Sequence, residues 1–200
     1  MAIVKHGVTA NTPSNILLGA GTFYKGLTYG TNGWTGTILG ATSGGGKVSI
    51  KGEFLDLEVD GALVKFKGQT IKVGGTATAE VTFAEVTTDI IKMGTLFEAG
   101  TSTSTGTGIT MLQDKAHIEE DDYIANFGFV GETADGSKQV IIIFENAICT
   151  SGLEIEGKNK EQSVVKLTLE AVADYSGDLN TLPVKIYYVE TSTSSGGSAG

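Results

Sequence analysis

A glycine-rich stretch that ends in lysine is the pattern in this sequence that most suggests chemistry. Residues 40–48 read GATSGGGKV, and glycine-rich loops followed by lysine bind nucleotide phosphates through backbone amides and the ammonium group. Here Ala41 replaces the first glycine of that motif, and Val48 replaces the hydroxyl residue that would hold Mg²⁺. The segment that follows alternates as a strand does, whereas the motif requires a helix. We therefore interpret the stretch as a flexible hairpin loop.

Carboxylates gather in one run at residues 119–122, which read EEDD. Hard cations such as Ca²⁺ bind carboxylate oxygens, but a calcium loop spaces its ligands and turns at a glycine. Four consecutive acids do not reproduce that spacing, and a run of like charge is usually a solvated face. We interpret this run as solvated surface.

Few residues are suited to acid–base or nucleophilic catalysis. His6 and His117 are the two histidines, and Cys149 is the single cysteine. None of them lies in a metal-ligand, triad or cysteine-nucleophile pattern, and one cysteine cannot form an intramolecular disulfide. We predict that the protein is not an enzyme and that it needs no cofactor or metal.

The charge composition argues against specific DNA binding. The formal net charge is −9 at pH 7, and the 14 basic residues are all lysine. Arginine is the side chain that pairs in two places with phosphates and guanine edges, so a sequence-reading DNA binder would rarely lack it. An acidic surface repels phosphates and so suits DNA that slides past.

The 200 residues fit one domain. We expect an N-terminal arm at residues 1–15, a single β domain at residues 16–190 and a flexible tail at residues 191–200. The first residues lack the apolar core of a signal peptide. The longest apolar run, residues 140–144, is far too short for a membrane helix. We therefore expect a soluble protein that is not exported by a signal peptide.

Two alternating segments around an Asp-Gly pair predict the first hairpin. Residues 52–59 place apolar and largely acidic side chains on opposite faces, and residues 62–67 follow Asp60 and Gly61. Asp-Gly between such runs favours a type I′ turn, because both central residues need positive φ. Residues 76–86 alternate again, which predicts a strand with one face exposed to solvent.

The period changes at residues 87–94, which predict one short helix. Threonine at its start, lysine in its last turn and Gly94 as its terminator are typical helix signals. The Ser/Thr/Gly stretch at residues 100–108 has little apolar surface and is interpreted as a mobile loop.

The second half repeats the strand pattern. Residues 123–132, the pair Asp135-Gly136 and residues 139–148 predict a second hairpin, and the apolar last segment is expected at the centre of the sheet. Residues 153–160 and 163–173 predict another reversal, and residues 184–189 predict a last strand.

Trp34 lies in a loop-like context, TNGWTG. Two interpretations stay open, since a large apolar ring there either packs on the domain's own core or anchors a neighbouring molecule. Together with Tyr24 and Tyr29, Trp34 would also suit a carbohydrate-binding β sandwich.

In the order of its elements the chain resembles the major tail tube proteins of long-tailed, siphophage-type bacteriophages. The resemblance begins with residues 52–93, which hold the Val59-Asp60-Gly61-Ala62 hairpin, the alternating strand and the helix. It continues through residues 122–126, the Asp135-Gly136 turn, residues 140–148 and residues 183–188, and so covers most of the chain from Ile16 to Val189. It implies a mainly β protein, a β sandwich or barrel of the phage tail tube type with one short flanking α-helix and extended loops and arms. Sheathed-tail tubes and a secretion-system tube protein share this fold.

The resemblance also implies a structural function. Copies of the chain would form hexameric rings that stack into a hollow tube, and the tube would conduct DNA during ejection. The tube would assemble in the host bacterial cytoplasm and reside in the virion tail. The implied partners are further copies of this chain, the tape measure protein, and tail terminator or tail tip proteins, with DNA passing unbound and no membrane contact.

Self-assembly is also reasonable on physical grounds, because unpaired strand edges can be completed by copies of the same chain. The residues expected in ring stacking and other inter-subunit contacts are Val4, Lys5, Trp34, Ser43, Gly45, Phe97 and Thr103. The acidic residues expected to face the lumen are Asp56, Glu58, Glu80 and Glu85. The alternative functions are a capsid decoration protein and an immunoglobulin-like adhesion or carbohydrate-binding module, which would remain monomeric or trimeric.

Overall fold

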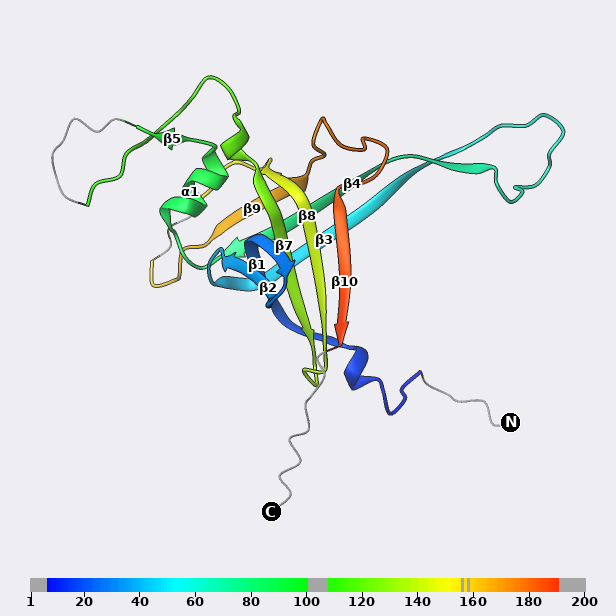
Figure 1. Ribbon diagram of the computed structural model, residues 1–200, viewed down its shortest axis with the longest axis horizontal. Coiled ribbons are helices and arrows are strands. Elements are labelled where there is room, and N and C mark those ends of the chain that lie inside the picture. The colour runs from blue at the N-terminus through cyan, green and yellow to red at the C-terminus, as the bar shows by residue number, and fades with distance from the viewer. Residues whose placement is uncertain (1–6, 101–107, 156, 158, 191–200) are drawn as a thin grey trace, which may run out of the picture.

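The structure is a computed structural model, and it describes residues 7–100, 108–155, 157 and 159–190. Strands dominate the described residues, as the sequence predicts, and one α-helix accompanies them (Figure 1). The elements are β1 (Leu17–Gly30), β2 (Gly33–Ile38), β3 (Thr42–Asp56), β4 (Thr70–Phe83), α1 (Thr88–Thr95), β5 (Glu98–Ala99), β6 (Leu112–Gln113), β7 (Ile124–Thr133), β8 (Lys138–Cys149), β9 (Val165–Ala171) and β10 (Val184–Glu190). Short 3₁₀ turns lie at Pro13–Asn15 and Glu120–Asp122.

Eight strands form one antiparallel sheet that branches at β8. The main order is β2-β1-β7-β8-β9-β4-β3, and β10 pairs with β8 outside this path. Residues 138–144 of β8 pair with β10, whereas residues 147–149 pair with β9. After the branch, β9, β4 and β3 cross the long strands β7 and β8 (Figure 1). The result is a curled, barrel-like sandwich, which confirms the predicted fold class.

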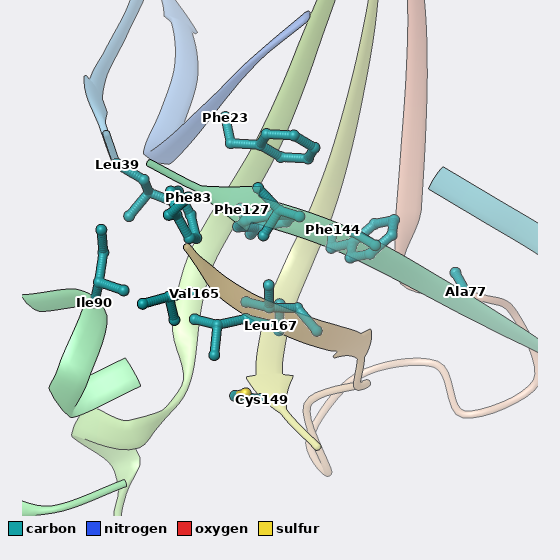
Figure 2. Packing of buried hydrophobic residues seen from close by; sticks show 14 residues of the cluster. Phe23, Leu39, Ala77, Phe83, Ile90, Phe127, Phe144, Cys149, Val165 and Leu167 are labelled. Atoms are coloured by element: carbon teal, nitrogen blue, oxygen red, sulfur yellow. The ribbon is translucent and has the colours of Figure 1, made fainter. Parts of the chain in front are cut away.

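The main core lies between the crossing strands and the β1-β7-β8 part of the sheet. Phe23, Phe127 and Phe144 form its centre, with ring centroids 5.7 Å apart for the first two and 5.8 Å apart for the last two. Figure 2 shows these rings above the aliphatic side chains of β9 and α1. The apolar positions of residues 77–83 are all buried in this core, which confirms the predicted alternation of β4.

A second, smaller cluster covers the opposite face of β7 and β8. Ile141 and Ile143 are buried there with Leu27 of β1, and Trp34 and Val189 pack against them. The neighbouring positions of β8, such as Phe144, point into the main core instead. Because successive strand residues face opposite sides, a strand covered on both faces needs an unbroken apolar run. This explains residues 140–144 and confirms their central position.

The triple-glycine run is part of strand β3, so its interpretation as a flexible loop is wrong. The register of β3 against β4 shifts between Thr42 and Gly46, with Gly44 and Gly45 at φ 75° and 80°. This is a β-bulge, where an extra residue needs unusual backbone angles. A Cβ atom on Gly46 would lie 2.4 Å from the Phe23 ring. The glycines therefore let β3 turn at a bulge and approach β1 closely.

The predicted helix is confirmed, but its termination differs. The hydroxyl of Thr87 caps α1 by accepting a hydrogen bond from the backbone N–H of Ile90 at 3.2 Å. Gly94 lies inside α1, where a Cβ atom would be 2.9 Å from Leu167. The left-handed residue that ends the helix is Leu96, at φ 59°. Gly94 thus serves the packing of α1 on β9, and the chain ends the helix two residues later.

The first hairpin forms with a different register from the predicted one. Residues 52–56 pair with residues 70–75, so the loop of the hairpin is residues 57–69 rather than Asp60 and Gly61 alone. Those two residues do form a turn, in which the N–H of Ala62 donates to the carbonyl of Val59 at 3.3 Å. The strong local turn signal is therefore real, but it lies within a longer loop.

Other strand predictions have mixed outcomes. The second hairpin around Asp135-Gly136 and the last strand are confirmed, as β7, β8 and β10. The reversal at residues 153–173 is confirmed in part: residues 165–171 form β9, which pairs with β4 and β8, and among the described residues one antiparallel bridge, Ile155 to Val165, joins the two predicted segments. β1 and β2 occupy residues for which the sequence predicted no strand, and Trp34, in a loop-like sequence context, lies in β2.

Candidate interaction surface

The four acidic residues predicted to face a lumen do not form one patch in the subunit. Asp56 pairs with Thr70, at the far end of the β3–β4 ladder, whereas Glu80 lies ten residues further along β4. At ~3.3 Å per strand residue, they are about 33 Å apart. Glu58 lies in the loop after β3, and Glu85 lies after β4 beside a cavity at the start of α1. A continuous acidic surface would require several subunits.

Two of these acids are already neutralised by lysines. Lys65 lies 2.6 Å from Asp56, and Lys47 lies 2.8 Å from Glu80. The hydrogen bond from Lys65, together with one from Thr70, lowers the pKa of Asp56 below its usual value. Asp56 therefore stays ionised at neutral pH, but its charge is paired. These contacts hold the hairpin together as well as shaping its electrostatics.

The residues predicted to make inter-subunit contacts are scattered. Val4, Lys5 and Thr103, like His6, lie outside the described residues. Ser43 and Gly45 are half-buried at the bulge of β3, so they belong to a strand and not to a free loop. Phe97 is half-buried just after α1. The described positions thus lie on three separate segments: β2, the bulge of β3 and the residues just after α1.

Trp34 packs within its own subunit. Its ring lies 5.0 Å from the ring of Tyr187 on β10 and 5.1 Å from the ring of Tyr29 on β1. It also contacts the second cluster, which contains Leu27. Of the two interpretations, these contacts favour packing on the protein's own core, and they join β2 to β10 across the curled sheet.

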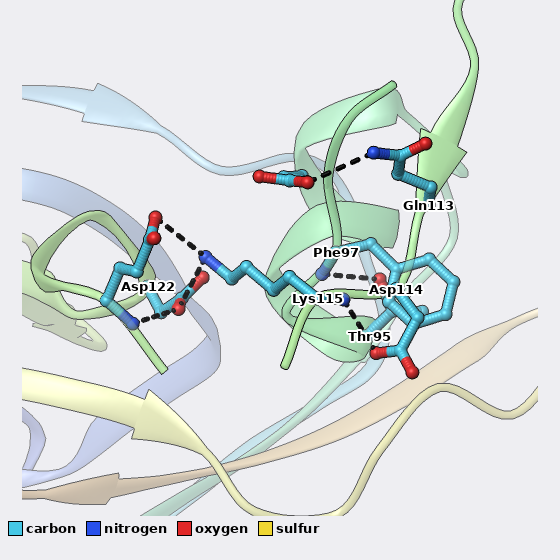
Figure 3. Close-up of polar contacts among 8 residues, drawn as sticks. Thr95, Phe97, Gln113, Asp114, Lys115 and Asp122 are labelled. Atoms are coloured by element: carbon cyan, nitrogen blue, oxygen red, sulfur yellow. Dashed lines mark hydrogen bonds and ion pairs between the residues drawn. The ribbon is translucent and has the colours of Figure 1, made fainter. Parts of the chain in front are cut away.

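The acidic run is only partly solvated surface. Glu120 and Asp121 are exposed, but the side chain of Asp122 is 7% exposed and lies 2.7 Å from the ammonium group of Lys115. The same carboxylate accepts a hydrogen bond from the backbone N–H of Glu119 at 2.7 Å (Figure 3). The hydrogen bond to Asp122 raises the pKa of Lys115. These contacts are internal to the segment between α1 and β7, and they join the residues after β6 to the 3₁₀ turn that leads into β7.

The most unusual surface of the subunit is the outer part of the β3–β4 hairpin, residues 53–73, which we name the hairpin extension. It projects beyond the rest of the sheet (Figure 1). Nine large apolar residues in it are 40–99% exposed: Phe54, Leu55, Leu57, Val59, Leu63, Val64, Phe66, Ile71 and Val73. At ~150 Å² for a large apolar side chain, this is on the order of 800 Å² of exposed apolar surface. Divided between the two faces of the ribbon, this is on the order of 400 Å² per face, similar to the largest apolar patch on a typical monomer, which is often functional.

A register shift brings Ile71 of β4 onto the outward face that carries Leu55 of β3. Glu53 pairs with Gly74 but Phe54 pairs with Lys72, so β4 has one extra residue at this point. Leu55 and Ile71 are then direct partners, and partners in an antiparallel ladder share a face. In the body of the sheet that same face carries polar pairs such as Lys47 and Glu80. The apolar face is thus directed away from the protein's own core.

The sequence contains the signal for this inversion. Val48, Ile50 and Phe54 occupy even positions of β3, whereas Leu55 and Leu57 continue the apolar alternation at odd positions. One step of register moves every side chain to the other face of a strand. A move of the apolar residues from even to odd positions therefore predicts either a bulge or a different surface that covers the strand. The alternation alone shows that these odd positions share an apolar face, but it does not show which surface covers that face.

A second exposed apolar surface lies at the free ends of β7, β8 and β10. One cross-strand row runs Phe23–Phe129–Ile142–Ile186, and its exposure rises from 0% at Phe23 to 61% at Ile186. The next row pairs Val140 with Tyr188, which is 56% exposed. We name this surface the open sheet end, and its residues are Leu17, Phe129, Val140, Ile142, Ile186 and Tyr188.

The open sheet end is a continuation of the main core. Val184 lies two residues before Ile186 on the same face of β10, and it packs against that core beside Phe144. The layer of β9, β4 and β3 crosses there, and the lower ends of β7, β8 and β10 extend beyond it (Figure 1). Within the described residues, β10 pairs only with β8, so its other edge is unpaired. The same strand therefore offers exposed side chains and an unpaired backbone edge.

Comparisons with known proteins assign no family. No family model matches the sequence, and a search of curated proteins finds no match. Among the described residues, no helix has the length and apolar character to cross a membrane.

Proposed function

We propose that the protein is a structural subunit that assembles with copies of itself into stacked hexameric rings, forming the tail tube of a long-tailed bacteriophage and the conduit for its DNA. The observation that carries the self-assembly is the hairpin extension, with nine large apolar residues exposed on a projecting ribbon. The resemblance of the sequence to major tail tube proteins is the basis for proposing hexameric rings, a stacked tube and the passage of DNA.

Burial of the hairpin extension would strongly favour association. At ~25 cal/mol per Å², covering even half of on the order of 800 Å² of apolar surface stabilises a complex by about 10 kcal/mol before the cost of association is subtracted. The same surface on a permanent monomer would promote aggregation. The unpaired edge of β10 adds backbone donors and acceptors that a neighbouring strand can satisfy.

The passage of DNA would depend on weak contact with phosphates. The net charge of −9 and the absence of arginine fit a wall that repels DNA. Because Asp56 and Glu80 are paired with lysines, Glu58 and Glu85 would contribute more of the repulsion. This proposal places the protein in the virion tail.

Electron microscopy of negatively stained, concentrated protein tests the assembly directly. We expect rings or hollow tubes, whose length grows with concentration. A particle that remains monomeric or trimeric at every concentration and salt would refute the proposal and favour a capsid decoration protein or an adhesion module. A Trp34 fluorescence titration with sugars tests the carbohydrate-binding alternative, for which we expect no change.

A further inference from the structure

We propose that the hairpin extension of one copy docks on the open sheet end of a second copy. Each subunit would then carry both halves of one head-to-tail contact. The inference rests on the proposed self-assembly and assigns its two contacting surfaces.

The two surfaces cannot meet within one subunit. The β3–β4 ladder is paired from the body out to Asp56 and Thr70, so the hairpin extension continues the direction of these strands. It projects to one side of the molecule, whereas the free ends of β8 and β10 point in a different direction (Figure 1). A paired ribbon does not fold back sharply without losing its ladder. The apolar face of the hairpin extension therefore requires another molecule.

The two surfaces match in area and character. The hairpin extension divides its exposed apolar surface between two faces, which leaves on the order of 400 Å² per face. Leu17, Ile186 and Tyr188 are 50–61% exposed, and with their half-buried neighbours they expose a similar area. A standard interface buries ~800 Å² per partner, of which somewhat more than half is apolar. One hairpin face on one open sheet end thus supplies the apolar centre of a stable contact.

Both surfaces have charges of both signs at their borders, including Lys67 and Lys72 on the hairpin extension and Glu190 beside the open sheet end, so opposite charges can pair across the contact. The ammonium group of Lys138 lies at the rim of the open sheet end, 3.0 Å from the side-chain oxygen of Asn15 and 5.5 Å from the centre of the Tyr188 ring. The loop of the hairpin extension carries Glu58 and Asp60, both exposed. Rim charges of opposite sign set orientation and association rate more than affinity.

A head-to-tail contact predicts a specific behaviour of mixtures. Such a contact does not close in a dimer, and it continues until a ring closes or a chain grows. A variant that lacks the hairpin face still offers its open sheet end, and the converse variant still offers its hairpin extension. Neither variant can assemble alone through this contact. One copy of each variant can form the contact with the other, which gives a dimer that grows no further.

The experiment uses two double variants of the full chain. Leu55→Glu with Ile71→Lys removes the apolar pair from the hairpin face. The new glutamate and lysine are cross-strand partners of opposite charge, so the pairing of β3 with β4 is kept. Ile186→Lys with Tyr188→Glu removes the two most exposed apolar side chains of the open sheet end. Tyr175→Lys with Leu179→Glu is the matched control, because these residues are 90% and 67% exposed and lie outside both surfaces. Circular dichroism checks that each variant is folded, and Ile186→Thr gives a milder change at the same strand position.

Particle mass, measured by light scattering and sedimentation, gives the result. We expect each double variant to stop at one small particle, the control to assemble as the wild type does, and the equimolar mixture to double the particle mass and then stop. If Ile186→Lys with Tyr188→Glu assembles normally, hairpins contact a different surface, and the inference is wrong while self-assembly stands. If the wild type itself never assembles, both the inference and the proposed function fail.

Discussion

Replacing Gly46 by alanine tests whether the glycine-rich run is a packed part of β3. A Cβ atom there would lie 2.4 Å from two atoms of the Phe23 ring and 3.1 Å from the carbonyl oxygen of Glu80. Phe23 has no exposed surface, and its ring lies between Phe127 at 5.7 Å and Phe129 at 5.2 Å. The ring therefore has little room to move. The backbone of Gly46 is not in the left-handed region, so the effect isolates the steric conflict.

Adding a methyl group to a well-packed core costs about 1–3 kcal/mol. For a domain of this size, each kcal/mol lowers Tm by ~2–4 °C, so we expect Gly46→Ala to lower Tm by about 2–12 °C. A flexible loop would show no loss, because alanine there restricts the unfolded chain and slightly stabilises the fold.

Thermal and urea unfolding of a monomeric background, such as Leu55→Glu with Ile71→Lys, gives the free energy of unfolding without a contribution from assembly. Gly30→Ala is the control, since no atom lies within 4 Å of its added Cβ atom. Phe23→Leu in the Gly46→Ala background should recover part of the loss, because the smaller side chain makes room for the methyl group. A change below about 0.5 kcal/mol for Gly46→Ala, or strict additivity with Phe23→Leu, would refute the reasoning.

Three further predictions concern assembly, acid stability and DNA passage. Leu55→Glu with Ile71→Lys should raise the critical concentration for assembly roughly 100-fold, because about 130 Å² of apolar contact, worth ~3 kcal/mol, is lost. Light scattering measures the critical concentration, and an increase of less than threefold would contradict this prediction. Hydrogen bonds from Ser14, and then from Ser137 and Thr133, lower the pKa of Asp135. Its contribution to stability is therefore complete above about pH 4 and declines as the pH falls further. Asp135→Asn should lower Tm at pH 7, and the difference from the wild type should narrow between about pH 4 and 2; a constant difference would argue against this. Four acidic residues are predicted to face the lumen: Asp56, Glu58, Glu80 and Glu85. Their replacement by lysine should slow the exit of DNA from assembled tails without blocking tube formation. An unchanged rate of exit would show that these residues do not face the DNA.

Sequence patterns predicted the elements whose burial is local and regular. The alternation of residues 77–83, the apolar run at residues 140–144 and the Asp135-Gly136 turn each became a strand or turn at the expected place. Thr87 capped the helix as expected. These features follow from side-chain period and capping chemistry, which act over a few residues.

Contacts between distant residues decided the rest. Gly46 looks like a loop residue until the ring of Phe23 occupies the place of its side chain, and Gly94 looks like a helix terminator until Leu167 packs against it. In both cases the neighbour is more than 20 residues away, and a local pattern contains no information about such a neighbour.

The candidate surface illustrates the same division. The sequence alone determined that Leu55 and Leu57 lie on one apolar strand face, and that the chain is acidic, lacks arginine and offers few groups for catalysis. Only the tertiary structure decided that Ile71 joins Leu55 on a face turned away from the protein's own core, because one extra residue in β4 changes the side to which Ile71 points. Register is a property of paired strands, and it is what makes an apolar face either a core or a surface for another molecule.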